Sequence, residues 1–100
     1  MEKLTTKQRA RLRSLAHPLK PILQLGKEGV SEGAVRTVET AFAHRELIKV
    51  KVLDSAPLDA RESAEELAGR VPGAHVVQVI GKTLVLYRAH PDRPVIALPQ

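Results

Sequence analysis

Four residues, Gly26-Lys27-Glu28-Gly29, form the motif in this chain of 100 residues whose types and spacing say most about chemistry. Two glycines let the backbone approach a ligand without a Cβ in the way, and a helix expected to begin just after Ser31 would direct its unpaired N–H groups at that approach. Lys27 adds a mobile cation, whereas Glu28 places a negative charge at the tip. The motif predicts a phosphate site, but a strand-to-helix turn that needs glycine at positive φ would leave the same pattern.

Positive charge gathers near the start of the chain. Residues 1–20 hold six Lys or Arg and one Glu, and the net charge of the whole chain is +5. Residues 51–75 carry five acids against three bases, and the last twenty-five residues carry three bases against one acid. Most charge runs are solvated helix faces, but a cluster this one-sided also indicates a polyanionic partner.

The remaining polar residues show no catalytic or metal-binding pattern. The chain has no cysteine, and its four histidines, His17, His44, His75 and His90, lack the pair spacings of metal sites. No nucleophile elbow, Walker loop or dinucleotide fingerprint occurs. We therefore expect no enzyme activity, no cofactor, no metal and no small-molecule substrate. A small enzyme would need a pocket that nothing in the sequence predicts.

The sequence also shows no segment typical of a membrane span or a targeting signal. No stretch reaches about 18 consecutive apolar residues, so no membrane span is expected. The first twenty residues lack the apolar core of a secretory signal. An Arg-rich amphipathic start can imitate an organelle transit peptide, but here it continues into the folded pattern without a linker. We expect a cytoplasmic protein.

Apolar periodicity and capping signals predict seven elements that position these residues. Thr5 with Gln8, and Asp59 with Glu62, have the spacing of capping boxes. Proline and glycine residues punctuate the pattern between the elements. The predicted helices cover residues 5–16, 31–44 and 59–71, and the predicted strands cover residues 22–25, 48–52, 75–80 and 83–88.

Three of the predicted strands carry specific expectations. Lys49 and Lys51 alternate with apolar residues, so this strand should have one apolar face and one basic face, and one face of the sheet should be open to solvent. The last two strands are separated only by Gly81-Lys82, which suits a type II′ hairpin.

The order α-β-α-β-α-β-β predicts a single α/β domain over residues 1–100. Strands separated by helices imply parallel crossovers, while the last pair must be antiparallel, so the expected architecture is a four-stranded mixed sheet packed with helices. Residues 1–4 and about 91–100 are expected to be more loosely ordered, and the proline-rich tail either wraps around the domain or frays.

Aromatic content constrains how a nucleic acid would be bound. Phe42 and Tyr87 are the only aromatic residues besides histidine, so the stacking platforms of many single-strand binders cannot be built. Tyr87 could offer one stacking surface or be partly buried in the sheet. Recognition of the backbone and of shape remains.

Four blocks of sequence together carry a family resemblance. They are residues 15–21 (LAHPLKP), 25–29 (LGKEG), 46–52 (ELIKVKV) and 78–88 (QVIGKTLVLYR). In this order they resemble the CRM domain, specifically its free-standing bacterial YhbY type, over nearly the whole chain. Residues 53–59 and the proline-rich tail match no pattern of the family.

The resemblance implies a fold similar to the C-terminal domain of a bacterial translation initiation factor, and RNA binding around the Gly-x-x-Gly loop. It also implies association with ribosomal RNA in precursors of the large ribosomal subunit, where the protein would assist rRNA folding. We further expect a monomer. The alternative from the residues alone is an adaptor that docks its positive face on an acidic ribosomal or translation factor.

Candidate RNA-binding residues follow from the resemblance and from charge. The resemblance implies an RNA-facing loop of Gly26, Lys27, Glu28 and Gly29, with phosphate contacts from Lys20, Lys49, Lys51, Lys82 and Arg88. Charge alone adds the first predicted helix, with Lys7, Arg9, Arg11 and Arg13.

Overall fold

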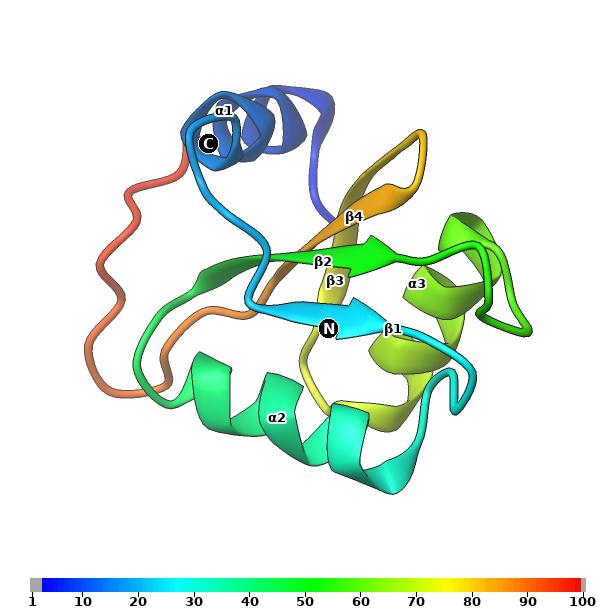
Figure 1. Ribbon diagram of the computed structural model, residues 1–100. Helices are drawn as coiled ribbons and strands as arrows, with labels where there is room; N and C mark the ends of the chain where they lie inside the picture. Colours follow the sequence, from blue (N-terminus) through cyan, green and yellow to red (C-terminus); the bar gives the residue numbers. More distant parts are fainter. Residues whose placement is uncertain (1–2, 100) are drawn as a thin grey trace.

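A computed structural model describes residues 3–99, and these residues form the predicted order of helices and strands (Figure 1). Residues 1, 2 and 100, for which loose ordering was expected, lie outside this range. The elements are α1 (Thr6–Ala16), β1 (Leu23–Leu25), α2 (Glu32–Phe42), β2 (Leu47–Val52), α3 (Ala60–Arg70), β3 (His75–Ile80) and β4 (Thr83–Tyr87). The prediction of a single α/β domain with this order is confirmed, and the observed element ends lie within two residues of the predicted ones.

Side-chain caps explain where the helices begin. Thr5 Oγ1 accepts a hydrogen bond from the backbone N–H of Gln8 at 3.1 Å, and Asp59 Oδ1 accepts one from Glu62 at 2.8 Å. In both places the side chain at the third helical position returns a bond to the cap backbone, which completes a capping box. Such a cap stabilises a helix by about 1 kcal/mol. The predicted helix starts were reliable because this signal is local.

The sheet is mixed, with the strand order β1-β2-β4-β3. β1 pairs with β2 in parallel, whereas β4 is antiparallel to both of its neighbours. β3 therefore runs parallel to β2 as the helical crossover predicts, but β4 lies between them. At the hairpin Gly81 has φ of +56°, whereas Lys82 does not have a positive φ. A type II′ turn requires this combination at its two central residues.

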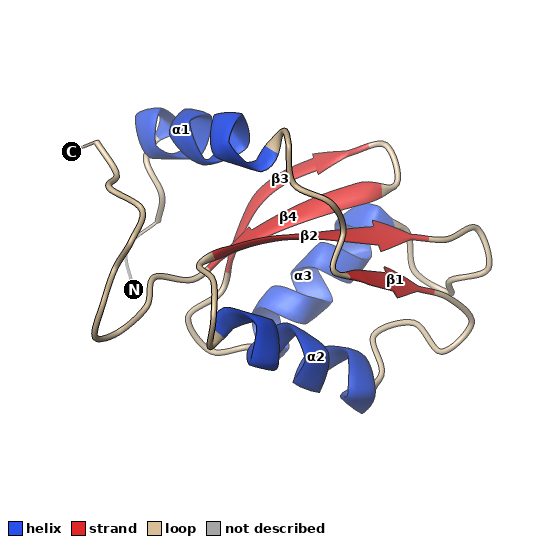
Figure 2. Cartoon of the chain, turned by 60° about the vertical axis from the view of Figure 1, so that its left-hand side comes forward, coloured by secondary structure: helices blue, strands red, loops and turns tan. Residues whose placement is uncertain are grey.

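Helices cover both faces of the sheet. α2 and α3 lie on one face and α1 lies on the other (Figure 2). The larger core includes Val38, Phe42, Val50, Leu67 and Leu86 between α2, α3 and the sheet. The expectation of one open sheet face is therefore only half right, because α1 covers part of the second face.

A smaller second core lies beneath α1. Its buried members are Leu12, Ala16, Leu47, Val77, Val85 and Tyr87. The register of β3 shifts between Val76 and Gln78, which places Val77 under α1. Tyr87 is only 6 % exposed, so of its two expected roles the structure favours core packing over a stacking surface.

The C-terminal tail is tied to the domain by a buried carboxylate. Glu46, just before β2, is 5 % exposed and accepts hydrogen bonds at 2.7 Å from the backbone N–H groups of His90, Val95 and Ile96. Ile96 and Leu98 pack against the second core, and Pro99 O accepts a bond from Gln8 of α1 at 3.1 Å. Of the two alternatives for the tail, the structure shows the wrapped one.

No helix among residues 3–99 is long and apolar enough to cross a membrane.

Candidate nucleic-acid interface

α1 leaves one half of its sheet face open, and this half forms a cleft. Side chains at odd positions of β2 point away from α2 and α3. Leu47, at the start of the strand, is covered by α1, whereas Lys49 and Lys51 lie beyond it. The cleft has a volume of about 910 Å³ and is lined by Arg13, Ser14, Ala16, His17, Leu19, Lys20, Pro21, Lys49, Lys51, Gln78, Ile80, Thr83 and Val85.

The charged residues of this cleft are all basic. Four predicted site residues come together there from three parts of the chain, namely Arg13, Lys20, Lys49 and Lys51, and no Asp or Glu belongs to its described lining. Lys49 Nζ donates a hydrogen bond to the backbone carbonyl of His17 at 3.3 Å, which directs its side chain toward the end of α1. The surface therefore offers several cations to a chain of phosphates, with no described carboxylate in the lining to compete.

The Gly-x-x-Gly motif forms a tight turn after β1. Gly29 N–H donates to Gly26 O at 2.9 Å, and Gly29 has φ of +59°. A Cβ at Gly29 would lie 2.8 Å from Pro57 Cγ, whereas one at Gly26 would meet no atom closer than 3.7 Å. Gly29 is thus required by the fold whatever the loop binds. Lys27 and Glu28 are both exposed at the tip of the turn.

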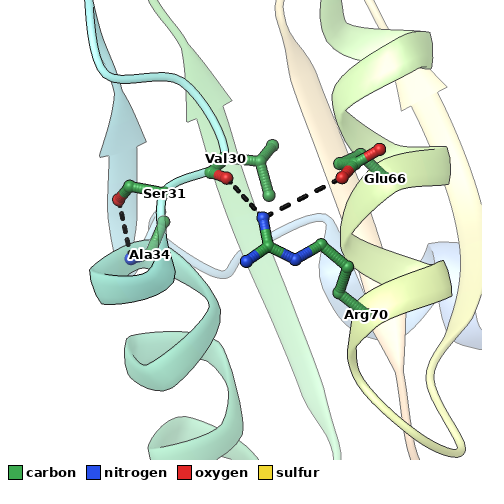
Figure 3. Close-up of polar contacts among 5 residues, drawn as sticks. All are labelled: Val30, Ser31, Ala34, Glu66 and Arg70. Carbon is green, nitrogen blue, oxygen red and sulfur yellow. Dashed lines mark hydrogen bonds and ion pairs between the residues drawn. The ribbon is translucent and has the colours of Figure 1, made fainter.

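Contacts from α2 and α3 hold the segment that follows this turn (Figure 3). Arg70, at the end of α3, donates to the backbone carbonyl of Val30 at 2.7 Å and lies 3.9 Å from Glu66. Ser31 caps α2 by accepting from Ala34 N–H at 3.1 Å. Arg70 was not predicted to have a role here. The sequence around Arg70 does not indicate this role, because the carbonyl that it contacts lies forty residues away in the chain.

The hairpin turn and the turn after β2 lie at the same end of the sheet as this loop, where β1 and β2 finish and β4 begins. Leu53 N–H donates to Leu25 O at 2.9 Å, and Val52 N–H donates to Lys82 O at 2.7 Å. Lys82 itself forms an exposed ion pair with Asp54. The predicted cations Lys27 and Lys82 therefore lie at the same end of the sheet, but a carboxylate already faces Lys82.

The other predicted cations have different environments. Lys7 and Arg11 are exposed on α1, whereas Arg9 is partly buried and donates to the backbone carbonyls of Val76 and Val77, the latter at 3.2 Å. Arg88 lies at the opposite end of β4 from the hairpin, with its guanidinium 5.1 Å from the centre of the Phe42 ring. It also donates to Pro72 O at 3.3 Å. Arg9 and Arg88 thus already have partners within the fold, and Arg88 lies away from the cleft.

Three groups near α1 and the tail have shifted pKa values. Burial, with the nearby positive charge of Arg9, lowers the pKa of His75, while burial and the charge of Glu46 raise the pKa of Tyr87. Burial alone would raise the pKa of Glu46. The hydrogen bonds from three backbone N–H groups and the charge of His90 together lower this pKa by more than burial raises it, so the net shift is downward.

Among residues 3–99 no three His, Asp or Glu side chains gather as a metal site would require.

Comparisons with known proteins agree on one family. The model of the CRS1 / YhbY (CRM) domain matches residues 4–88. A Bacillus subtilis protein named probable RNA-binding protein YqeI is 43 % identical over 96 residues, which cover 96 % of this chain and 99 % of the relative. A Haemophilus influenzae protein named RNA-binding protein is 43 % identical over 88 residues, or 88 % of each chain.

A solved structure is similar over the full domain. The solution structure of a Staphylococcus aureus protein, described as a candidate RNA-binding protein, has a TM-score of 0.78 and 40 % sequence identity, covering 97 % of this chain and 100 % of the other. The names of these three proteins describe RNA binding, and none of them describes a catalysed reaction.

Proposed function

Because this chain belongs to the CRS1 / YhbY (CRM) domain family, we propose that it is a non-enzymatic RNA-binding protein of the cytoplasm. Its RNA is ribosomal, and it acts on precursors of the large ribosomal subunit. By neutralising phosphates it lets rRNA segments approach one another and so assists their folding. The names of the bacterial relatives support the RNA-binding part of this proposal, and the assembly role extends it.

The observation that carries the proposal is the convergence of Arg13, Lys20, Lys49 and Lys51 on one cleft without a described carboxylate in its lining. These residues are spread over positions 13–51 of the chain, and solvated charges without a common role need not gather on one surface. Lys27, exposed beyond the end of β1, adds one more cation outside the lining of the cleft.

The number of cations sets the expected salt dependence. If the four cations of the cleft and Lys27 each neutralise one phosphate, a duplex-like RNA should show a slope of log affinity against log salt of about −4.5. Lys82 contributes less because Asp54 competes for it, and Arg9 and Arg88 contribute less because the fold already uses them.

Sedimentation of a cell extract through a sucrose gradient tests the assembly role. The protein should migrate with particles slightly lighter than the mature large subunit, and ribonuclease or added salt should release it. A triple variant with Lys20, Lys49 and Lys51 changed to Gln should remain at the top of the gradient. The matched control changes three exposed arginines elsewhere, Arg36, Arg45 and Arg61, to Gln, and it should migrate like the wild type.

The same gradient distinguishes the adaptor alternative. A protein that docks on an acidic protein partner would keep its partner after ribonuclease treatment, although salt would still release it. Recovery of the wild type only at the top of the gradient, at both low and moderate salt, would contradict an association with ribosomal precursors.

A further inference from the structure

The cleft between α1 and the sheet is lined by aliphatic residues, which we call its floor, as well as by cations, which we call its rim. Leu19, Ile80 and Val85 line it together with Ala16 and Pro21. Ile80 is 61 % exposed, and it is one of only two large hydrophobic side chains among the described residues that are exposed to this degree. Phosphates would interact with the cations of the rim, but they gain nothing from this aliphatic surface.

The composition of the cleft fits a nucleotide better than a phosphate alone. Ser14, Gln78 and Thr83 add side-chain donors and acceptors to the lining. The volume of about 910 Å³ lies within the range of roughly 300–1,000 Å³ that is usual for small-ligand sites. A base inside a duplex is stacked and paired, so its faces cannot reach such a floor, whereas an unpaired base can be turned outward and buried.

We propose that the cleft holds one or two unpaired nucleotides of the bound RNA. Their phosphates contact Lys49, Lys51 and the other rim cations, and a base packs on the aliphatic floor at Ile80. This inference rests on the proposed RNA-binding function and deepens it, because it makes the preferred RNA one with an unpaired loop or bulge. Contact with the face of a base discriminates little between bases, so the preference is for structure rather than for sequence.

Two RNAs with the same number of phosphates test the inference: a fully paired hairpin, and a hairpin of equal length whose stem is two base pairs shorter and carries a four-nucleotide bulge. Wild-type protein should bind the bulged RNA about tenfold more tightly. Ile80→Thr should reduce this preference by about fivefold, the effect of removing most of one buried aliphatic contact. The slope of affinity against salt should not change, because no phosphate contact is lost.

A matched control uses the other exposed hydrophobic residue. Val95 is 83 % exposed in the tail and does not line the cleft, so Val95→Thr should leave the preference at the wild-type value. A dinucleotide probe, ApA, should also shift the methyl NMR signals of Ile80 and Val85 in the wild type.

The outcomes separate the two claims. Equal binding of both RNAs by the wild type, or an Ile80→Thr protein with unchanged preference, would overturn the cleft site while RNA binding stands. Failure of folded wild-type protein to bind either RNA would overturn the proposed function and the cleft site with it.

Discussion

Replacement of Glu46 by Gln should release the C-terminal tail and lower the stability of the domain. Glu46 Oε1 accepts from the N–H groups of Val95 and Ile96, and Oε2 accepts from that of His90, each at 2.7 Å. A glutamine side chain keeps one oxygen and presents an NH₂ group in place of the other. Whichever way the amide is turned, at least one partly buried N–H loses its acceptor and faces a donor instead.

The magnitude follows from these contacts. Leaving one buried donor unpaired costs about 1–3 kcal/mol, and the bonds that remain lose the strengthening of a charged acceptor. We expect a loss of about 2 kcal/mol, which for a domain of this size lowers Tm by roughly 8–16 °C. Since the tail can detach before the domain unfolds, amide exchange at Val95 and Ile96 should accelerate most.

Thermal unfolding and hydrogen exchange measure the two effects. Glu65→Gln, the same substitution at an exposed position of α3, is the control and should leave both readouts unchanged. If Glu46→Gln had the Tm of the control and unchanged exchange at Val95 and Ile96, the assignment of Glu46 as the anchor of the tail would be refuted.

The lowered pKa of Glu46 also fixes the pH dependence of its contribution. A carboxyl group whose pKa is lower in the folded state contributes stability that is fully present above its unfolded pKa of about 4.3 and is lost as pH falls through its folded value. The Tm difference between the wild type and Glu46→Gln should therefore be constant near neutral pH and shrink below about pH 4.

Three further predictions concern the Gly-x-x-Gly loop and the turns at the same end of the sheet. Gly29→Ala should destabilise the domain by about 1–2 kcal/mol in chemical denaturation, because alanine is strained at positive φ, whereas Gly26→Ala should be tolerated. Asp54→Asn should raise RNA affinity about twofold to threefold and steepen the salt slope by freeing Lys82, with less than about 0.5 kcal/mol effect on stability because the ion pair is exposed. Lys27→Glu should weaken binding to different RNA sequences alike while Tm stays unchanged; unchanged affinity would remove the loop from the interface.

The predictable part of the fold is the part set by local sequence. Capping boxes at Thr5 and Asp59, and the alternation of lysine with apolar residues along β2, gave the elements and the basic strand face. The side of the sheet on which α1 packs was not predictable, because a short apolar stripe built on Leu12 and Ala16 could cover either face. Its position depends on Leu47, Val77 and Tyr87, which come together only in the folded sheet.

The candidate site was predictable as a set of cations but not as a surface. A count of charges treats Lys49, Lys82 and Arg88 alike, whereas the fold places the first in a cleft, the second beside Asp54 and the third over Phe42. The sequence did not indicate that Glu46 anchors the tail, since one more acid in a stretch of balanced charge is usually a solvated side chain. Its partners are backbone groups more than forty residues away, and only the folded tail brings them within reach.

The interaction of Arg9 with β3 bears on how copies of this protein behave toward one another. β3 is an edge strand, and an unprotected edge can add a strand from a neighbouring molecule and begin aggregation. Here the register shift between Val76 and Gln78 interrupts the regular row of backbone N–H and C=O groups along β3. The Arg9 guanidinium also donates hydrogen bonds to the carbonyls of Val76 and Val77. The opposite edge, β1, has only three residues. Arg9 therefore makes the edge a poor template for edge-to-edge association.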